Sequence, residues 1–206
     1  MRGGIGNQMP RDEAKAKVIK IQRFNDRDMV CCTLELSRRY LAAQPKSWLI
    51  LYYYARSLYA MTRFTESLAA LRRAARLCPP KMLCWVYSRF GQVHEKRGAF
   101  RPAERWYRLA IKHSPSDASF HIYLGKFLAR AGRLQEAAAV HRRATRCKEG
   151  CIDEAFLFLG LALRALERYS DARKCFKRAL DIDPKYKEAR KELDDVEQVI
   201  ELIRNA

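Results

Sequence analysis

Apolar and polar residues alternate along most of this chain with the period of an α-helix. In one such stretch Tyr123, Leu124, Phe127 and Leu128 are spaced so that they share one helix face. Stretches of this kind come in pairs between 48 and 186, and a short turn separates the two members of each pair. The pattern predicts an all-α protein built from pairs of amphipathic helices.

The helix pairs repeat one sequence pattern with a nearly fixed period. Four windows align: LYYYARSLYAMTRFTESLAALRRA at 51–74, YSRFGQVHEKRGAFRPAERWYRLA at 87–110, HIYLGKFLARAGRLQEAAAVHRRA at 121–144 and FLFLGLALRALERYSDARKCFKRA at 156–179. Their aligned mid-helix residues lie 34 to 36 positions apart and are Ala55, Gly91, Gly125 and Gly160. A unit of about 34 residues is the period of a helix–turn–helix solenoid, in which each unit buries its apolar face against the next.

The sizes of the recurring residues explain the pattern. A mid-helix glycine costs about 1 kcal/mol relative to alanine, which we expect where another helix backbone passes close by. The second helix of each window then carries a small, a large and an alanine position: Ser67, Leu71, Ala74; Ala103, Tyr107, Ala110; Ala137, His141, Ala144; Ala172, Phe176, Ala179. Prolines at 79, 115 and 184 follow these helices, because proline cannot continue the hydrogen-bond ladder.

These positions resemble the tetratricopeptide repeat family. The resemblance implies a right-handed α-solenoid with repeats at 48–83, 84–117, 118–152 and 153–186. We expect a degenerate repeat at 14–47, a capping helix at 187–206 and a flexible tail at 1–13. The third window departs from the family pattern, because His141 stands where an aromatic or apolar residue is usual.

The chain is strongly basic, with a formal net charge of +18 over 206 residues. Such a surface attracts anions, including acidic peptides, nucleic acid and acidic lipid headgroups. The apolar stretch at 48–61 contains Arg56 and is too short to span a bilayer, and we see no secretory signal. The seven cysteines form no disulfide-scaffold pattern, so we expect reduced and mostly buried thiols in a cytoplasmic, intracellular protein.

No catalytic motif stands out. The sequence contains no glycine-rich phosphate loop and no GxSxG or HExxH motif. The best metal candidates are His141, Cys147 and Cys151, but their spacing matches no common zinc pattern. We therefore expect no enzyme activity, no cofactor and no metal site.

The resemblance implies that the first helix of each repeat lines a concave face that binds peptides or partner proteins. The candidate residues of this groove are aromatic or cationic: Tyr52, Tyr53, Arg56, Tyr59, Trp85, Arg89, Lys96, Tyr123, Lys126, Arg130, Phe158 and Arg164. Such residues favour binding of an acidic or hydrophobic peptide segment, and a segment at the end of a chain is one such ligand. The family's chaperone-binding clamp needs a set of Lys and Asn residues that these slots lack. The alternative is that some of these side chains only pack or are solvated.

A second basic feature lies on the second helices of the repeats. Arginines occupy outer positions, where the family usually mixes Glu and Lys: Arg72, Arg73, Arg76, Arg142, Arg143 and Arg146. This stripe suits phosphates, so a nucleic-acid or ribonucleoprotein-binding module is the alternative to a protein scaffold. A solvated cationic face is also compatible with it. Residues 181–206, which include the predicted capping helix, hold eight acids and five bases. A further alternative is that this acidic helix docks on the basic groove of a second copy of the chain.

Overall fold

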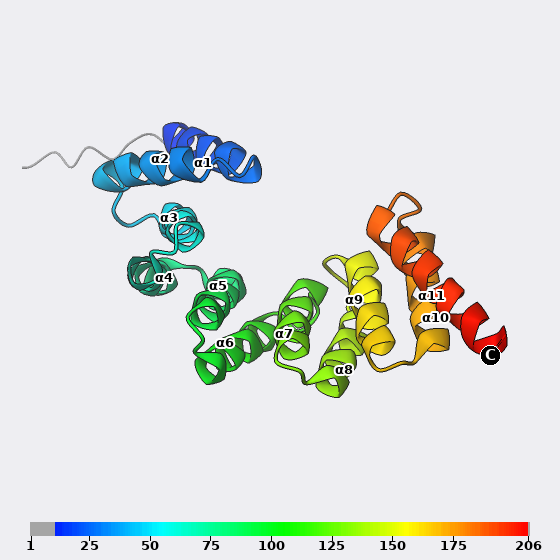
Figure 1. The fold of residues 1–206 in the computed structure, drawn as a ribbon. Helices are drawn as coiled ribbons and strands as arrows, with labels where there is room; N and C mark the ends of the chain where they lie inside the picture. The colour runs from blue at the N-terminus through cyan, green and yellow to red at the C-terminus, as the bar shows by residue number, and fades with distance from the viewer. Residues whose placement is uncertain (1–10, 206) are drawn as a thin grey trace, which may run out of the picture. The chain divides into compact units, whose positions relative to one another are not determined.

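The computed structural model describes residues 11–205, which form two compact units divided between Val93 and His94. Figure 1 labels the helices in chain order. The first unit holds α1 (Arg11–Asp26), α2 (Val30–Ala43), α3 (Trp48–Ala60), α4 (Phe64–Leu77), the short 3-10 helix η1 (Pro80–Met82) and most of α5 (Leu83–Lys96). The second unit holds α6 (Phe100–His113), α7 (Ala118–Arg130), α8 (Leu134–Ala144), α9 (Ile152–Ala165), α10 (Tyr169–Ile182) and α11 (Lys187–Asn205). The part of the chain that is described contains no β-strand, which confirms the all-α prediction.

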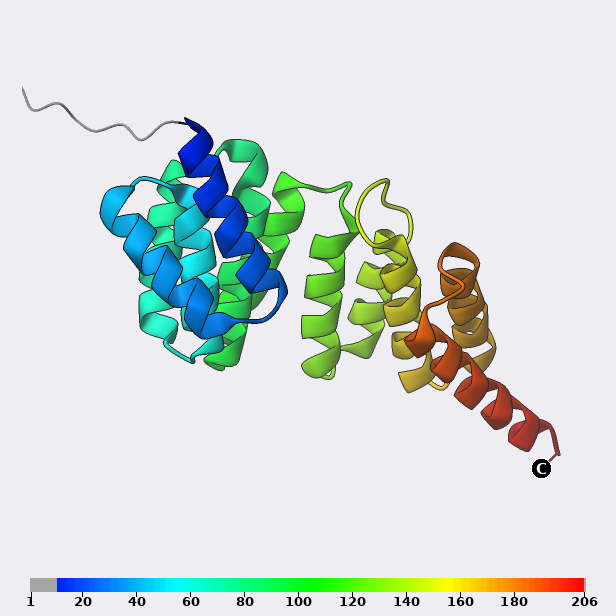
Figure 2. The ribbon, with the colours of Figure 1, turned by 90° about the horizontal axis from the view of Figure 1, so that it is seen from above.

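The recurring small, large and alanine positions are all in the core. The large residues Leu71, Tyr107, His141 and Phe176 expose at most 1% of their surface, and the small and alanine positions expose none. In the second unit, α7 packs on α8 and α9 packs on α10 (Figure 2). The repeat pattern therefore identifies residues that are buried between helices.

The mid-helix glycines make room for a ring instead of a helix backbone. A Cβ atom added at Gly125 would lie 2.4 Å from the imidazole of His141. A Cβ atom at Gly160 would lie 2.4 Å from the ring of Phe176. The expectation of a close backbone approach is corrected in these two repeats: the large residue of the second helix occupies the space that a side chain would need.

The turns between paired helices each contain a residue in the left-handed region. Gly98 and Gly132 adopt φ angles of 72° and 76°, as expected for a glycine that follows a helix. Thr62 and Glu167 both adopt a φ of 59° at the corresponding turns, although neither is glycine. The backbone of this turn is therefore kept in repeats whose sequence does not favour it.

Proline marks the ends of the second helices as predicted. Helices α2, α4, α6 and α10 each end two residues before a proline, at Pro45, Pro79, Pro115 and Pro184. No such proline follows helix α8. Instead, the backbone of the turn between α8 and α9 forms hydrogen bonds with the turn before α7. The amide of Ala118 donates to the carbonyl of Glu149 at 2.9 Å, and the amides of Lys148 and Glu149 donate to that of Ser116 at 3.1 Å.

The described part of the chain begins and ends with a helix. Helix α1 begins at Arg11, inside the segment predicted as a tail, while residues 1–10 of that segment lie outside the described residues. Helix α11 buries Ala189, Leu193 and Val196 and packs on α10. No helix among residues 11–205 combines the length and the apolar character that crossing a bilayer requires.

Candidate functional site

In the first unit, an arginine lies between two tyrosines. The guanidinium carbon of Arg89 on α5 lies 5.7 Å from the ring centre of Tyr52 and 5.8 Å from that of Tyr59. Arg89 also donates to the hydroxyl of Tyr52 at 3.4 Å and to the side-chain carbonyl of Gln92. Tyr52 and Tyr59 are seven residues apart on α3, so they share one face of that helix. We call these three residues the arginine–tyrosine cluster.

The other predicted residues of the first unit surround this cluster. Arg56 is half-buried on the same helix, and the described residues supply it with no ion pair or hydrogen bond. Tyr53 packs edge-on against Tyr52 with ring centres 5.8 Å apart. Burial raises the pKa of Tyr53, with smaller contributions from Tyr52 and Asp26, so its hydroxyl stays protonated at neutral pH. Trp85 is half-buried on α5.

A pocket of about 230 Å³ opens beside the cluster. Its polar lining includes Asn25, Asp28, Thr33, Arg56, Tyr59 and Arg89, and we call it the α3 pocket. Half of these residues come from the end of α1, the following turn and α2. The sequence did not reveal this contribution, because helices 11–26 and 30–43 carry little of the repeat pattern.

In the second unit, a cation lies over an aromatic ring. The ammonium of Lys126 on α7 lies 4.3 Å from the ring centre of Phe158 on α9. His141 stacks on the same ring at 5.6 Å. Lys126 also forms an ion pair at 3.9 Å with Glu154. Burial raises the pKa of Glu154, and the charge of Lys126 opposes that rise.

Two further predicted cations of the second unit have acidic partners in the chain itself. Arg130 pairs with Glu95 at 2.5 Å, and Glu95 also accepts a hydrogen bond from Tyr107 at 2.7 Å. Arg164 pairs with Glu192 at 2.5 Å and with Asp195 at 2.8 Å, both on α11. The sequence did not predict that α11 would reach this arginine. The first-helix face of this unit therefore has less uncompensated positive charge than its sequence suggests.

The remaining groove candidates lie apart from these ion pairs. Lys96 is exposed at the end of α5, and Tyr123 is half-buried on α7 against the core cluster that contains Tyr107 and Phe127. Tyr123 also lies with its ring centre 6.4 Å from that of Phe120. Part of the aromatic set thus packs within the repeats, which was the alternative interpretation for some of these residues.

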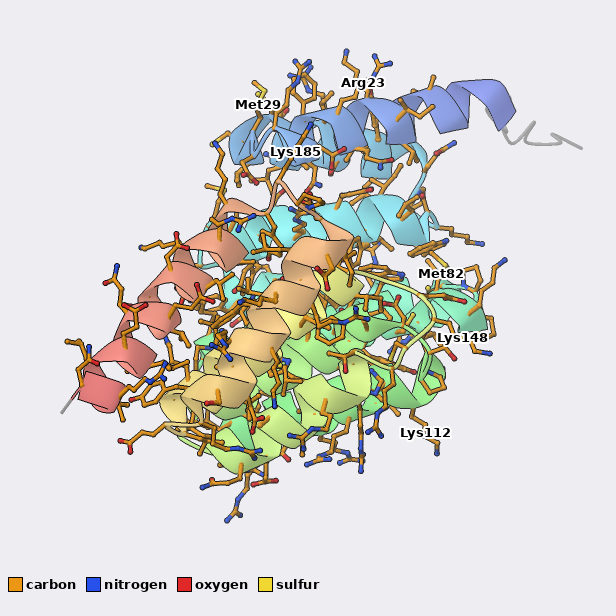
Figure 3. All side chains as sticks on the ribbon, turned by 90° about the vertical axis from the view of Figure 1, so that its right-hand side faces the viewer. Arg23, Met29, Met82, Lys112, Lys148 and Lys185 are labelled. Carbon is orange, nitrogen blue, oxygen red and sulfur yellow. The ribbon has the colours of Figure 1, made fainter. Side chains whose placement is uncertain are left out.

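All six arginines of the outer stripe are exposed on α4, on α8 and in the turn after α8. Arg73 donates to the carbonyl of Pro45 at 3.2 Å. The other five have no ion pair with any residue that the structure describes. The neighbouring bases Lys112 and Lys148 are also exposed and extend away from the ribbon (Figure 3).

The metal candidates do not converge. Among the side chains that the structure describes, which belong to residues 16–205, no three His, Cys, Asp or Glu side chains are placed to hold a metal ion. His141 stacks on Phe158, whereas the sulfur of Cys147 lies 3.8 Å from Nδ1 of His121. The expectation that most cysteines are buried is wrong, because three of the seven are: Cys78, Cys84 and Cys175.

The fold described above is that of an α-solenoid protein built from helix–turn–helix repeats. One model of the tetratricopeptide repeat family matches residues 35–81 and 89–150, and a second matches residues 154–186. The chain therefore belongs to the tetratricopeptide repeat family. No curated protein matches its sequence.

Solved structures share the fold at low sequence identity. YrrB, described as a TPR protein with an unusual peptide-binding site, is 17% identical with a TM-score of 0.56, over 85% of this chain and 89% of its own. The thermophilic TPR protein TTC0263 of Thermus thermophilus is 18% identical with a TM-score of 0.67, over 88% and 97%. The Cut9–Hcn1 structure from the APC/C is 16% identical with a TM-score of 0.70, over 89% of this chain and 36% of the matched chain. These similarities establish the fold alone.

Proposed function

We propose that this chain is a non-catalytic scaffold or adaptor that binds a segment of a partner protein on the first helices of its repeats. Its family and fold are typical of protein-interaction modules, and YrrB is described as a peptide-binding member. The observation that carries the proposal is the arginine–tyrosine cluster on α3 and α5. Tyrosine and arginine are the residue types that most often dominate binding energy at protein interfaces.

The chemistry of this face favours an acidic or hydrophobic segment. A guanidinium binds a carboxylate through two parallel hydrogen bonds, and the tyrosine rings offer apolar area at low entropic cost. In the second unit, Phe158 adds apolar surface, but Glu154 already pairs with Lys126. We therefore expect acidic residues of the partner to contact mainly the first unit. The seven cysteines are an odd number and cannot all pair in disulfides within the chain. The proposal therefore includes a reducing, cytoplasmic location.

The proposal is tested by fluorescence anisotropy with two labelled peptides. One is rich in Glu and Phe, and the matched peptide has Lys in place of each Glu. We expect the acidic peptide alone to bind, and we expect Arg89→Ala to weaken its binding about tenfold. Arg72→Ala is the matched control, because Arg72 is exposed on α4 outside the groove. Equal binding of the two peptides, or equal effects of the two substitutions, would contradict the proposal.

Binding to nucleic acid is a second candidate function, favoured by the exposed arginines of the outer stripe. A labelled single-stranded RNA titrated over a salt series tests it. If Arg142, Arg143 and Arg146 each contact a phosphate, their joint reversal to Glu lowers the slope of log affinity against log salt by about 2. Lys81→Glu is the control, because Lys81 is exposed outside the stripe. Absence of binding near physiological salt would exclude this candidate.

A further inference from the structure

We propose that the α3 pocket binds a single carboxylate of the partner segment. This inference rests on the proposed scaffold function and names the part of the surface where the acidic group is held. It assigns a binding role to the turn between α1 and α2, which the repeat pattern does not cover.

The pocket is built from polar groups that the fold holds in place. Asn25 and Thr33 are 7% and 1% exposed at its wall. The hydroxyl of Thr33 donates to the carbonyl of Met29 at 3.0 Å, and the amide of Asn25 donates to Asp26 at 3.3 Å. A small concave site with a few fixed polar groups is suited to orienting one polar ligand group.

The charges of the pocket favour an anion. Arg56 is half-buried there without an ion pair or hydrogen bond from any described residue. A guanidinium that is partly removed from water in this way gains most from a ligand that supplies a carboxylate. Arg89 lies in the same wall and is already oriented by Tyr52 and Tyr59. Such preorganisation lowers the entropic cost of binding.

The size and the remaining charge of the pocket limit the anion. A volume of about 230 Å³ is below the range of pockets for drug-sized ligands, so it suits one side chain or one chain end. Asp28 lies in the wall at a φ of 51° and leaves the two arginines with one excess positive charge. A carboxylate with one negative charge matches this excess, whereas the second charge of a phosphate would be repelled by Asp28.

The carboxylate has two sources, the end of a chain or an internal Asp or Glu. Two pairs of short, otherwise uncharged peptides separate them in titrations of the ¹⁵N-labelled full chain followed by NMR. The first pair has a free or an amidated C-terminus. The second pair is amidated and carries one internal Glu or Gln. We expect one charged member to bind at least tenfold more tightly than its neutral partner, with shifts at Asn25, Thr33 and Arg56.

Substitutions test the named residues. Arg56→Gln keeps most of the side chain's length and is expected to reduce carboxylate binding about tenfold, while Arg72→Gln leaves it unchanged. Asp28→Asn, which removes the repelling charge, is expected to strengthen it. Thermal unfolding of each variant verifies that it is folded. Equal binding of charged and neutral peptides, insensitivity to Arg56→Gln, or tighter binding of inorganic phosphate than of acetate would overturn the proposal.

The outcomes separate this inference from the scaffold function. If the acidic peptide of the anisotropy assay binds in an Arg89-dependent manner but Arg56→Gln has no effect, the pocket assignment fails and the scaffold stands. If neither that peptide nor any carboxylate probe binds, both the pocket assignment and the proposed scaffold function fail.

Discussion

Replacing His141 by phenylalanine is expected to make the second unit less sensitive to acid. His141 is 1% exposed, and its ring fills the space over Gly125. Its Nδ1 atom is buried with no hydrogen-bond partner among the described residues. Burial and, to a smaller extent, the charge of Lys126 lower the pKa of His141 from 6.5 to about 4. The imidazole is therefore neutral at pH 7 in the folded chain.

The direction of the pH effect follows from the two pKa values of His141. As the pH falls below 6.5, the unfolded chain takes up a proton that the folded chain does not accept until about pH 4. This contribution to stability is therefore fully present above pH 6.5 and is lost between pH 6.5 and about 4. At 1.36 kcal/mol per pH unit the complete loss is about 3 kcal/mol, and about 2 kcal/mol of it occurs by roughly pH 5.

The phenylalanine variant isolates this effect because the fold already accepts that residue in the same slot. Phe176 fills the corresponding space over Gly160 with an exposure of 0%. The substitution also leaves Glu154 in place, whose raised pKa works in the opposite direction by favouring the folded state as the pH falls. Subtracting the two pH profiles therefore cancels the contribution of Glu154.

The assay is urea unfolding of both proteins at pH 7.5 and near pH 5, followed by circular dichroism. We expect the parent chain to lose about 2 kcal/mol more than His141→Phe between the two conditions. Parallel profiles for the parent and His141→Phe would refute the reasoning.

Two further substitutions test the packing and the turns. Gly125→Ala places a methyl group 2.4 Å from the ring of His141, so we expect a loss of about 1–3 kcal/mol in urea unfolding, and an unchanged midpoint would contradict this. Glu167→Gly removes the backbone strain of a non-glycine residue at a φ of 59°, and we expect it to stabilise the chain by about 1 kcal/mol. Gly98→Ala, at a φ of 72°, should destabilise by a similar amount, and the same sign for both changes would count against the argument.

The repeat core could be predicted because its signal is local. Phe176 is buried against α9, the first helix of its own pair, and Tyr107 is buried against α7 of the next repeat. Both contacts recur with the repeat period, so the size and spacing of the residues are sufficient to predict their burial. The same local pattern predicted the end of α10, because Pro184 stands two residues after it. The turn at Glu167 also follows the repeat period, since its backbone is left-handed like that of the other turns although the residue is not glycine.

The candidate site was less predictable because it depends on pairs of residues far apart in the sequence. Arg164 and Asp195 are 31 residues apart and meet only because α11 packs on α10 in one register. The contribution of Asn25 and Thr33 to the α3 pocket depends on two helices whose repeat pattern is weak. Burial of single positions follows from periodicity, whereas the partner of a charge follows from tertiary packing.

The distribution of ion pairs within the chain determines where an acidic ligand gains the most binding free energy. To bind Arg130 or Arg164, a ligand carboxylate must displace Glu95 or the acids of α11, so the exchange replaces one ion pair by another. To bind Arg56, it breaks no ion pair, because no described residue forms one with that guanidinium. The free energy of a new charge-assisted hydrogen bond is therefore retained in the first unit and largely cancelled in the second. For this reason we expect a segment with a single acidic residue to bind with that residue at the α3 pocket.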